Sequence, residues 1–203
     1  MSAPEFKELE EAARAVIGGL KGMPEFNTAR LVAIGGLTVL KHLPNYRSTM
    51  DVDLMINVEG APKEVKARLL GIPNGPFEKW AEVFIYRTDD KQKLIQIDIC
   101  PGWMGPYIPD TAMRICDIPA GHVPYLTELD VMVFKIRSCG LRADETKRKR
   151  DAADAFHLLK DLAENGPITL TPTQVAAVRE GLPAVLERTS VEEQWWRTTL
   201  NVP

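Results

Sequence analysis

Apolar residues recur at helical spacing in several stretches of the chain. The first, Glu5 to Leu20, carries Leu9, Ala12, Ala13, Val16, Ile17 and Leu20 and predicts a helix. Ala61 to Leu70 predicts a second amphipathic helix, with Pro62 in its first turn. From Thr127 onward every apolar stretch is helical. We expect a long helix to about Leu141, another from Lys147 to Ala163, and two or three short helices from about Thr171 to near Trp196.

Short apolar runs between the first helix and residue 127 predict strands instead. The clearest are Arg30 to Ile34, Val52 to Val58, and a pair formed by Val83 to Arg87 and Leu94 to Cys100, which Asp89-Asp90-Lys91 connects as a turn. Phe77 to Glu82 is ambiguous, and Pro101 to Asp110 is a loop because it is rich in glycine and proline. Two further short strands are expected at Met113 to Ile118 and His122 to Leu126.

This change of pattern predicts an α/β (α+β) protein in two parts. Residues 1–126 form an α/β core with an N-terminal helix, and residues 127–203 form a helical subdomain packed on the core. A chain of 203 residues is long enough for one such domain with a helical extension.

Composition and charge narrow the location and the partners. The net charge of −3 gives no strong non-specific attraction to nucleic acid, and no apolar run is long enough to span a membrane. The N-terminus is acidic, unlike a signal peptide, so a cytoplasmic protein is expected. Cys100, Cys116 and Cys139 are far apart and are interpreted as buried free thiols.

Candidate chemistry begins with a glycine pair and three aspartates. Gly35 and Gly36 follow the apolar run of the first strand and precede a short helix that ends around Leu43-Pro44, so they lie where backbone N–H groups can face an anion. Asp51 and Asp53 are two residues apart in a strand, which places both carboxylates on one face. Asp98 lies in the alternating strand Leu94 to Cys100, where its charge needs a partner. Three carboxylates on adjacent strands predict a divalent-cation site for two-metal phosphoryl or nucleotidyl transfer.

The segment from Gly35 through Asp53, followed by Asp98, resembles the core motif of the DNA polymerase β-like nucleotidyltransferase superfamily. The AbiEii-type branch is the most similar, because it also carries a helix with a lysine and an arginine, matched by Lys135 and Arg142. A basic-Asp-x-x-Asp cluster follows in that branch, matched by Arg150, Asp151 and Asp154. The resemblance covers roughly residues 30 to 160. It implies a small mixed sheet flanked by helices and followed by a helical bundle.

The resemblance also implies an activity and roles for single residues. The chain would move a nucleoside monophosphate from a nucleoside triphosphate to a hydroxyl group, releasing pyrophosphate, with Mg²⁺ or Mn²⁺ held by Asp51, Asp53 and Asp98. Gly35, Gly36, Thr38, Arg47, Lys135 and Arg142 would bind the nucleotide. The family often places a serine or threonine where this chain has Leu37, and Thr38 follows one residue later.

Several alternatives stay open at this point. The chain could be a catalytically inactive binding or interaction protein on the same fold, or it could transfer phosphate from a nucleotide to a small molecule. The acceptor could be a small molecule, an RNA or a protein. Arg47 and Thr49 could contact phosphate, brace the turn or belong to a surface loop, and Asp151 and Asp154 could be charges at the start of a helix.

Overall fold

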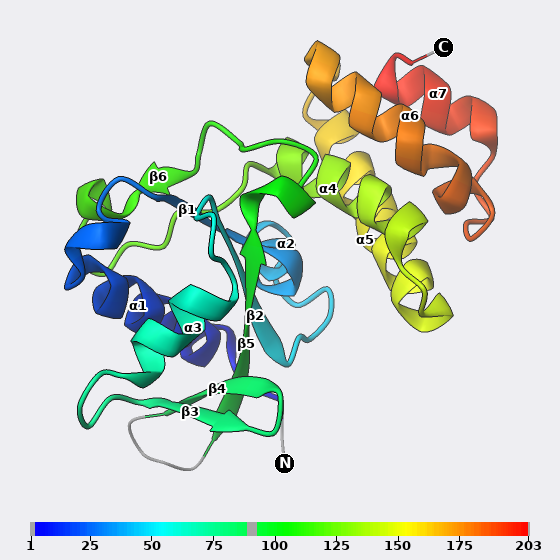
Figure 1. Cartoon of the computed structure of the whole chain (residues 1–203). Helices are drawn as coiled ribbons and strands as arrows, with labels where there is room; N and C mark the ends of the chain where they lie inside the picture. Colours follow the sequence, from blue (N-terminus) through cyan, green and yellow to red (C-terminus); the bar gives the residue numbers. More distant parts are fainter. Residues whose placement is uncertain (1–2, 89–92, 203) are drawn as a thin grey trace. The chain divides into compact units, whose positions relative to one another are not determined.

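The computed structural model describes residues 3–88 and 93–202, so the expected turn at Asp89-Asp90-Lys91 lies outside the described residues. The chain divides into two compact units, Met1–Leu126 and Thr127–Pro203. The division falls where the apolar pattern becomes continuously helical. Strands occur in the first unit, and the described part of the second unit is helical (Figure 1).

The first unit contains one sheet, which has six strands among the described residues. Its order is β3-β4-β5-β2-β1-β6. Strands β2 and β5 are parallel, and all other neighbours are antiparallel, so the sheet is mixed, as the resemblance implied. The strands are β1 (Arg30–Ile34), β2 (Asp51–Ile56), β3 (Phe77–Trp80), β4 (Val83–Arg87), β5 (Leu94–Pro101) and β6 (Met113–Arg114).

Buried apolar residues alternate with polar ones along the central strands β2 and β5, so one face of these strands packs in the core and the other is polar. Val52, Leu54 and Ile56 are buried, as are the three isoleucines of β5 at positions 95, 97 and 99. They join the core with the helices α1 (Phe6–Lys21) and α3 (Lys63–Leu70), which Figure 1 draws beside these strands. The residues between them point to the opposite face, because side chains alternate along a strand. That face carries the acidic side chains.

The structure resolves one ambiguous segment and differs from two of the predicted strands. Phe77–Trp80, within the ambiguous stretch, is an edge strand that pairs with β4. Only Met113–Arg114 of the expected strand at Met113 to Ile118 pairs, and a 3-10 turn, η3 (Ile115–Asp117), follows it. The prediction of a strand at His122 to Leu126 is wrong: the segment makes a single bridge, between Tyr125 and Ala33. Pro124 lies inside it and has no N–H to donate to a neighbouring strand.

The short elements of the first unit connect the sheet to its helices. Helix α2 (Gly35–His42) follows β1 directly, and the 3-10 turns η1 (Pro24–Phe26) and η2 (Gly102–Met104) lie before β1 and after β5. Pro62 occupies the N-cap of α3, so that helix begins two residues later than the pattern predicted.

The second unit is built from α4 (Glu128–Leu141), α5 (Glu145–Glu164), α6 (Pro172–Leu186) and α7 (Glu193–Leu200). Side chains of Thr127, Asp144 and Thr171 cap the first three helices by accepting bonds from backbone N–H groups. Trp196 is fully buried and packs against Phe156 of α5. Trp196 thereby packs the C-terminal helix α7 against α5.

Helices α4 and α6 approach closely at Gly181. A Cβ built on Gly181 would lie 2.5 Å from the carbonyl carbon of Ile136 and 2.6 Å from the Cα of Arg137. Both are backbone atoms of α4, which cannot rotate away as a side chain can. We therefore expect Gly181→Ala to lower the free energy of unfolding of the second unit by about 1–3 kcal/mol, measured by chemical denaturation.

Gly140 provides a matched control on the facing helix. A Cβ at Gly140 would make only ordinary contacts, at 3.7 Å to Gly181 and 3.8 Å to Ala184. Gly140→Ala should be neutral or stabilising, because alanine favours the helix by up to about 1 kcal/mol. Equal destabilisation by the two substitutions would contradict this account of the helix crossing.

A carboxyl pair links α4 to α5 and makes the second unit sensitive to pH. Burial, together with the charge and hydrogen bond of Asp161, raises the pKa of Glu128 from 4.5 to about 7. The folded chain therefore binds more protons than the unfolded chain between these two values, and its stability falls as the pH rises through that window. We expect the free energy of unfolding of Glu128→Gln to decrease less than that of wild type between pH 4.5 and pH 7. The same decrease in both proteins would contradict this role of Glu128.

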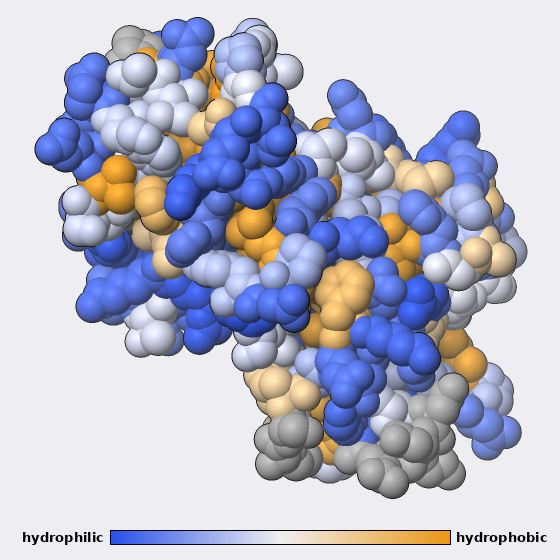
Figure 2. All heavy atoms as spheres, turned by 180° about the vertical axis from the view of Figure 1, so that it is seen from behind, coloured by the Kyte–Doolittle hydropathy of each residue, from blue (hydrophilic) through white to orange (hydrophobic). Residues whose placement is uncertain are grey.

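Surface features are modest. On the face drawn in Figure 2, hydrophobic residues occur in small separate areas among hydrophilic ones. Among the described residues, none of the helices combines the length and apolarity that crossing a membrane requires.

All three cysteines are free, but only Cys139 is buried. Cys116 is exposed, so the expectation of buried thiols is wrong for that residue.

Candidate metal centre

Three aspartates meet on the polar face of the central strands. Strands β2 and β5 run parallel with Asp53 opposite Asp98 and Asp51 opposite Gln96. Neighbouring strands lie about 4.8 Å apart, so the register alone brings Asp53 and Asp98 side by side. Asp51 is two residues before Asp53 and points to the same face.

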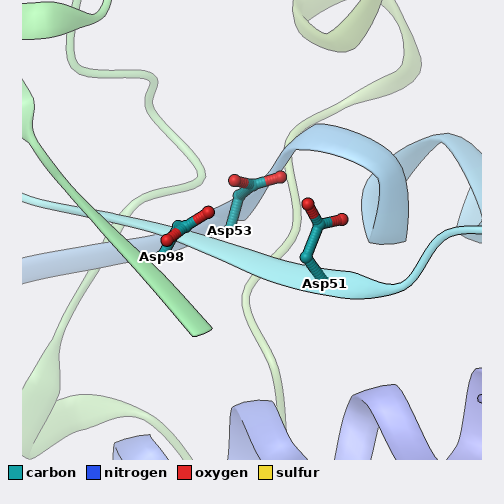
Figure 3. Close-up of side chains that lie close together, drawn as sticks. All are labelled: Asp51, Asp53 and Asp98. Carbon is teal, nitrogen blue, oxygen red and sulfur yellow. The ribbon is translucent and has the colours of Figure 1, made fainter. Parts of the chain in front are cut away.

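The carboxylates converge as this register requires. One oxygen from each of Asp51, Asp53 and Asp98 lies within 4.8 Å of the other two, and all three residues are half-buried. In Figure 3 the two side chains of β2 and the side chain of β5 gather on the same side of the strands, with Asp53 between the others. The predicted convergence of the three acids is therefore present.

The donor set fits a hard divalent cation. All three groups offer carboxylate oxygens, which are the ligands that Mg²⁺, Mn²⁺ and Ca²⁺ prefer, and no sulfur or imidazole belongs to the cluster. Paired metal ions in phosphoryl-transfer sites lie roughly 3.5–4 Å apart, a spacing that carboxylates this close can bridge. Half-burial leaves these groups accessible to a cation and its water ligands.

The glycine pair lies directly beside the acids. Ile34 of β1 is opposite Asp53, and α2 begins at the next residue, Gly35. Gly35 has a φ of +70°, a left-handed conformation that favours glycine. A Cβ on Gly35 would lie 2.7 Å from the carboxyl carbon of Asp53. The absence of a side chain at Gly35 thus lets the Asp53 carboxylate lie against the start of α2, where N–H groups of the first turn face outward.

Thr49 and Gln96 donate hydrogen bonds to Asp51 and Asp98, respectively. The Thr49 hydroxyl donates to Oδ1 of Asp51 at 2.7 Å, and Nε2 of Gln96 donates to Oδ2 of Asp98 at 2.9 Å. Thr49 is buried, whereas Gln96 is exposed. Sequence reasoning left Thr49 without a fixed role and gave Gln96 none. The only signals were the spacing of two between Thr49 and Asp51 and the face that Gln96 shares with Asp98.

Thr38 and Arg47, the other predicted nucleotide-binding residues of the first unit, do not lie beside the acids in the way that Gly35 does. Thr38 is fully buried in α2, so its side chain presents no surface to a phosphate, and its hydroxyl has no hydrogen-bond partner among the described residues. Arg47 is half-buried in the loop before β2, and its guanidinium donates to the carbonyl of Ser48 at 2.9 Å. The structure therefore places the half-buried Gly35 next to the acids, whereas Gly36 and Thr38 are both buried.

Lys135 and Arg142 lie in the second unit and share an acidic partner. Lys135 Nζ lies 2.7 Å from Asp151 and 2.9 Å from Asp154, and Nε of Arg142 lies 2.9 Å from the second oxygen of Asp151. Burial lowers the pKa of Lys135, but the two carboxylates outweigh burial and leave it raised, so the amine is charged at neutral pH. Asp151 and Asp154 are not charges at the start of a helix, because α5 begins at Glu145 and both residues are buried within it.

Comparison with known proteins identifies the fold. The chain is similar to an antigenic nucleotidyltransferase-like protein from Paracoccidioides brasiliensis, with a TM-score of 0.65, 17% identity, and coverage of 97% of this chain and 93% of that one. No protein-family model and no curated protein matches the sequence. At this identity the likeness shows the fold alone: the chain has a nucleotidyltransferase-like fold.

Two further solved structures are similar at lower scores. The antibiotic-resistance factor ANT(2″)-Ia has a TM-score of 0.43 and 14% identity, covering 88% of this chain and 96% of its own. The nucleotidyltransferase toxin MenT4 of Mycobacterium tuberculosis has a TM-score of 0.38 and 15% identity, covering 95% of this chain and 86% of its own.

Proposed function

We propose that this chain is a metal-dependent nucleotidyltransferase of the AbiEii-type branch. It would transfer a nucleoside monophosphate from a nucleoside triphosphate to a hydroxyl group of an acceptor. The observation that carries the proposal is the convergence of Asp51, Asp53 and Asp98 within 4.8 Å, on a nucleotidyltransferase-like fold and beside a glycine pair at a helix start. An inactive binding protein is not favoured, because selection for binding alone would not require three mutually repelling carboxylates.

Each acid has a role that follows from its position. Asp51 and Asp53, on one strand, would both hold Mg²⁺ or Mn²⁺ together with the triphosphate. When bound, the metal supplies charge neutralisation at the phosphates and lowers the pKa of the attacking hydroxyl. Asp98, on the neighbouring strand, would hold the metal ion on the side of the attacking hydroxyl and would assist removal of that hydroxyl's proton. The hydroxyl oxygen then bonds to the α-phosphorus, and the bond from that phosphorus to the leaving pyrophosphate breaks.

The phosphates would bind at the start of α2. Its first-turn N–H groups have no partners within the helix and carry the positive end of the helix dipole. Gly35 and Gly36 allow close backbone approach there, and Arg47 lies in the loop that leads to Asp51. The roles proposed for Lys135 and Arg142 rest on the resemblance alone, because both cations are engaged by Asp151.

A labelling experiment tests the proposal and separates it from its enzymatic rival. Wild-type protein is incubated with cell extract, Mg²⁺ or Mn²⁺ and each nucleoside triphosphate in turn, labelled at either the α- or the γ-phosphate. We expect label from the α-phosphate to reach an acceptor and pyrophosphate to be released. The variant Asp51→Ala/Asp53→Ala should transfer none.

Two outcomes of this experiment would contradict the proposal. Transfer of the γ-label instead of the α-label would indicate phosphate transfer to a small molecule. No transfer of either label, combined with no metal-dependent nucleotide binding, would exclude catalysis of this kind. The nature of the labelled product also distinguishes the acceptor, since RNA, protein and small molecules separate by size and by sensitivity to nuclease and protease.

A further inference from the structure

Thr49 is buried in a loop whose adjacent residues are exposed. Its exposed fraction is 7%, whereas Ser48 is exposed and Met50 is 55% exposed. A loop residue whose side chain turns inward between two outward neighbours is held by specific contacts. Two of these contacts define what Thr49 does.

The first contact is with the start of α2. A Cβ built on Gly36 would lie 2.8 Å from the Cβ of Thr49, closer than real side chains allow. The glycine at position 36 therefore leaves the space that the Thr49 side chain fills. The Thr49 side chain therefore packs directly against the start of α2.

The second contact is with the metal site. From this buried position the Thr49 hydroxyl donates a hydrogen bond of 2.7 Å to Oδ1 of Asp51. A carboxylate has about four lone-pair sites, so Asp51 keeps several for a cation after accepting this bond. Gln96 makes a comparable bond to Asp98, but it is exposed and water can replace it. Of these two bonds, the Thr49 bond is the one shielded from solvent.

We propose that Thr49 is a positioning residue that orients the Asp51 carboxylate for a divalent cation. The inference rests on the proposed function, because it assumes that Asp51 binds a metal. The glycine pair then has a second task besides phosphate approach: Gly35 admits Asp53 and Gly36 admits Thr49, so two residues of one helix start fix both acids of β2. Residues that hydrogen-bond a metal ligand commonly change metal affinity or activity by roughly 10- to 100-fold when they are replaced.

Binding of Mn²⁺ alone, without nucleotide, tests this role. Free Mn²⁺ is counted by electron paramagnetic resonance while wild type, Thr49→Val, Thr49→Ser and Thr88→Val are titrated. Valine keeps the shape of threonine without the hydroxyl, and we expect about 10-fold weaker binding or more. Serine keeps the hydroxyl and should restore affinity close to that of wild type. Thr88 is a buried threonine of the same unit whose hydroxyl bonds to Lys93, so Thr88→Val controls for loss of a buried hydroxyl remote from the acids.

The outcomes separate this inference from the proposed function. If Thr49→Val binds Mn²⁺ as tightly as wild type, the inference is wrong; a raised KM for the nucleotide in that case would assign Thr49 to substrate instead. If wild type itself binds no Mn²⁺, the proposed metal site fails and the inference fails with it. Thermal unfolding confirms that each variant folds, and Thr49→Ala, which removes the hydroxyl with less bulk, replaces valine if that variant does not.

Discussion

Asp53→Asn is expected to lower nucleotide transfer by roughly 10³-fold or more with the fold retained. A metal ion stabilises the transition state of phosphoryl transfer by several kcal/mol, and each 1.36 kcal/mol corresponds to about tenfold in rate. Asp53 lies between Asp51 and Asp98, so its neutralisation weakens the whole cluster (Figure 3). Asparagine has nearly the shape of aspartate and fits the space that Gly35 leaves.

Initial rates of transfer at saturating Mn²⁺ and nucleotide measure this effect. The increase in melting temperature that Mn²⁺ produces in wild type should also be lost in the variant. Asp110→Asn is the matched control, because Asp110 is an exposed aspartate of the same unit that does not belong to the cluster. A variant Asp53→Asn with near-normal activity would remove this residue from the metal centre.

Lys135→Met is expected to lower the free energy of unfolding of the second unit by about 3–5 kcal/mol, the usual result of removing one partner from a buried charge network. The amine lies between Asp151 and Asp154, whose side chains are 3% and 0% exposed. Methionine fills most of the volume but leaves two buried carboxylates without their cation. Because the pKa of Lys135 is raised, the stability that its protonation contributes is present below 10.5, the ordinary pKa of lysine, and is lost as the pH rises through the higher pKa of the folded chain.

Chemical denaturation of the full chain gives the free energy, and hydrogen exchange localises the loss to α4 and α5. Arg142→Met provides the comparison: Arg142 also contacts Asp151, but its side chain is 44% exposed. Exposed pairs contribute about 1 kcal/mol or less, so this variant should be much less affected. A Lys135→Met variant that is no less stable than Arg142→Met would show that the buried cluster does not hold these helices together.

The acids of the site were predictable from sequence because strand periodicity is exact. Asp51 and Asp53 are two residues apart, so their side chains lie on the same face of their strand. Asp98 alternates with buried isoleucines, so its side chain lies on the polar face of its own strand. What the sequence could not give was the register between β2 and β5, which places Asp53 opposite Asp98. Register depends on contacts between segments about forty residues apart in the chain, and the resemblance supplied that link before the structure did.

The side chains that contact the three aspartates and Lys135 were less predictable, because these contacts depend on how the elements pack together. Whether Thr49 contacts Asp51 depends on how the Thr49 side chain packs against Gly36. Thr38 is buried because it lies on the side of α2 that faces the core. The sequence left open that Asp151 and Asp154 are charges at the start of a helix, whereas both are buried against Lys135 of another helix. Local charge patterns do not reveal burial between helices.

Nucleotidyl transfer at this site requires that Asp51, Asp53 and Asp98 hold divalent cations. The most direct test of this requirement is anomalous diffraction from crystals of the wild-type protein grown with Mn²⁺ and a non-hydrolysable nucleoside triphosphate analogue. We predict manganese peaks within coordination distance, about 2.0–2.6 Å, of oxygens from all three aspartates, with the triphosphate at the start of α2. Nucleotide bound elsewhere, or manganese absent from the three aspartates in crystals that contain both, would contradict the account.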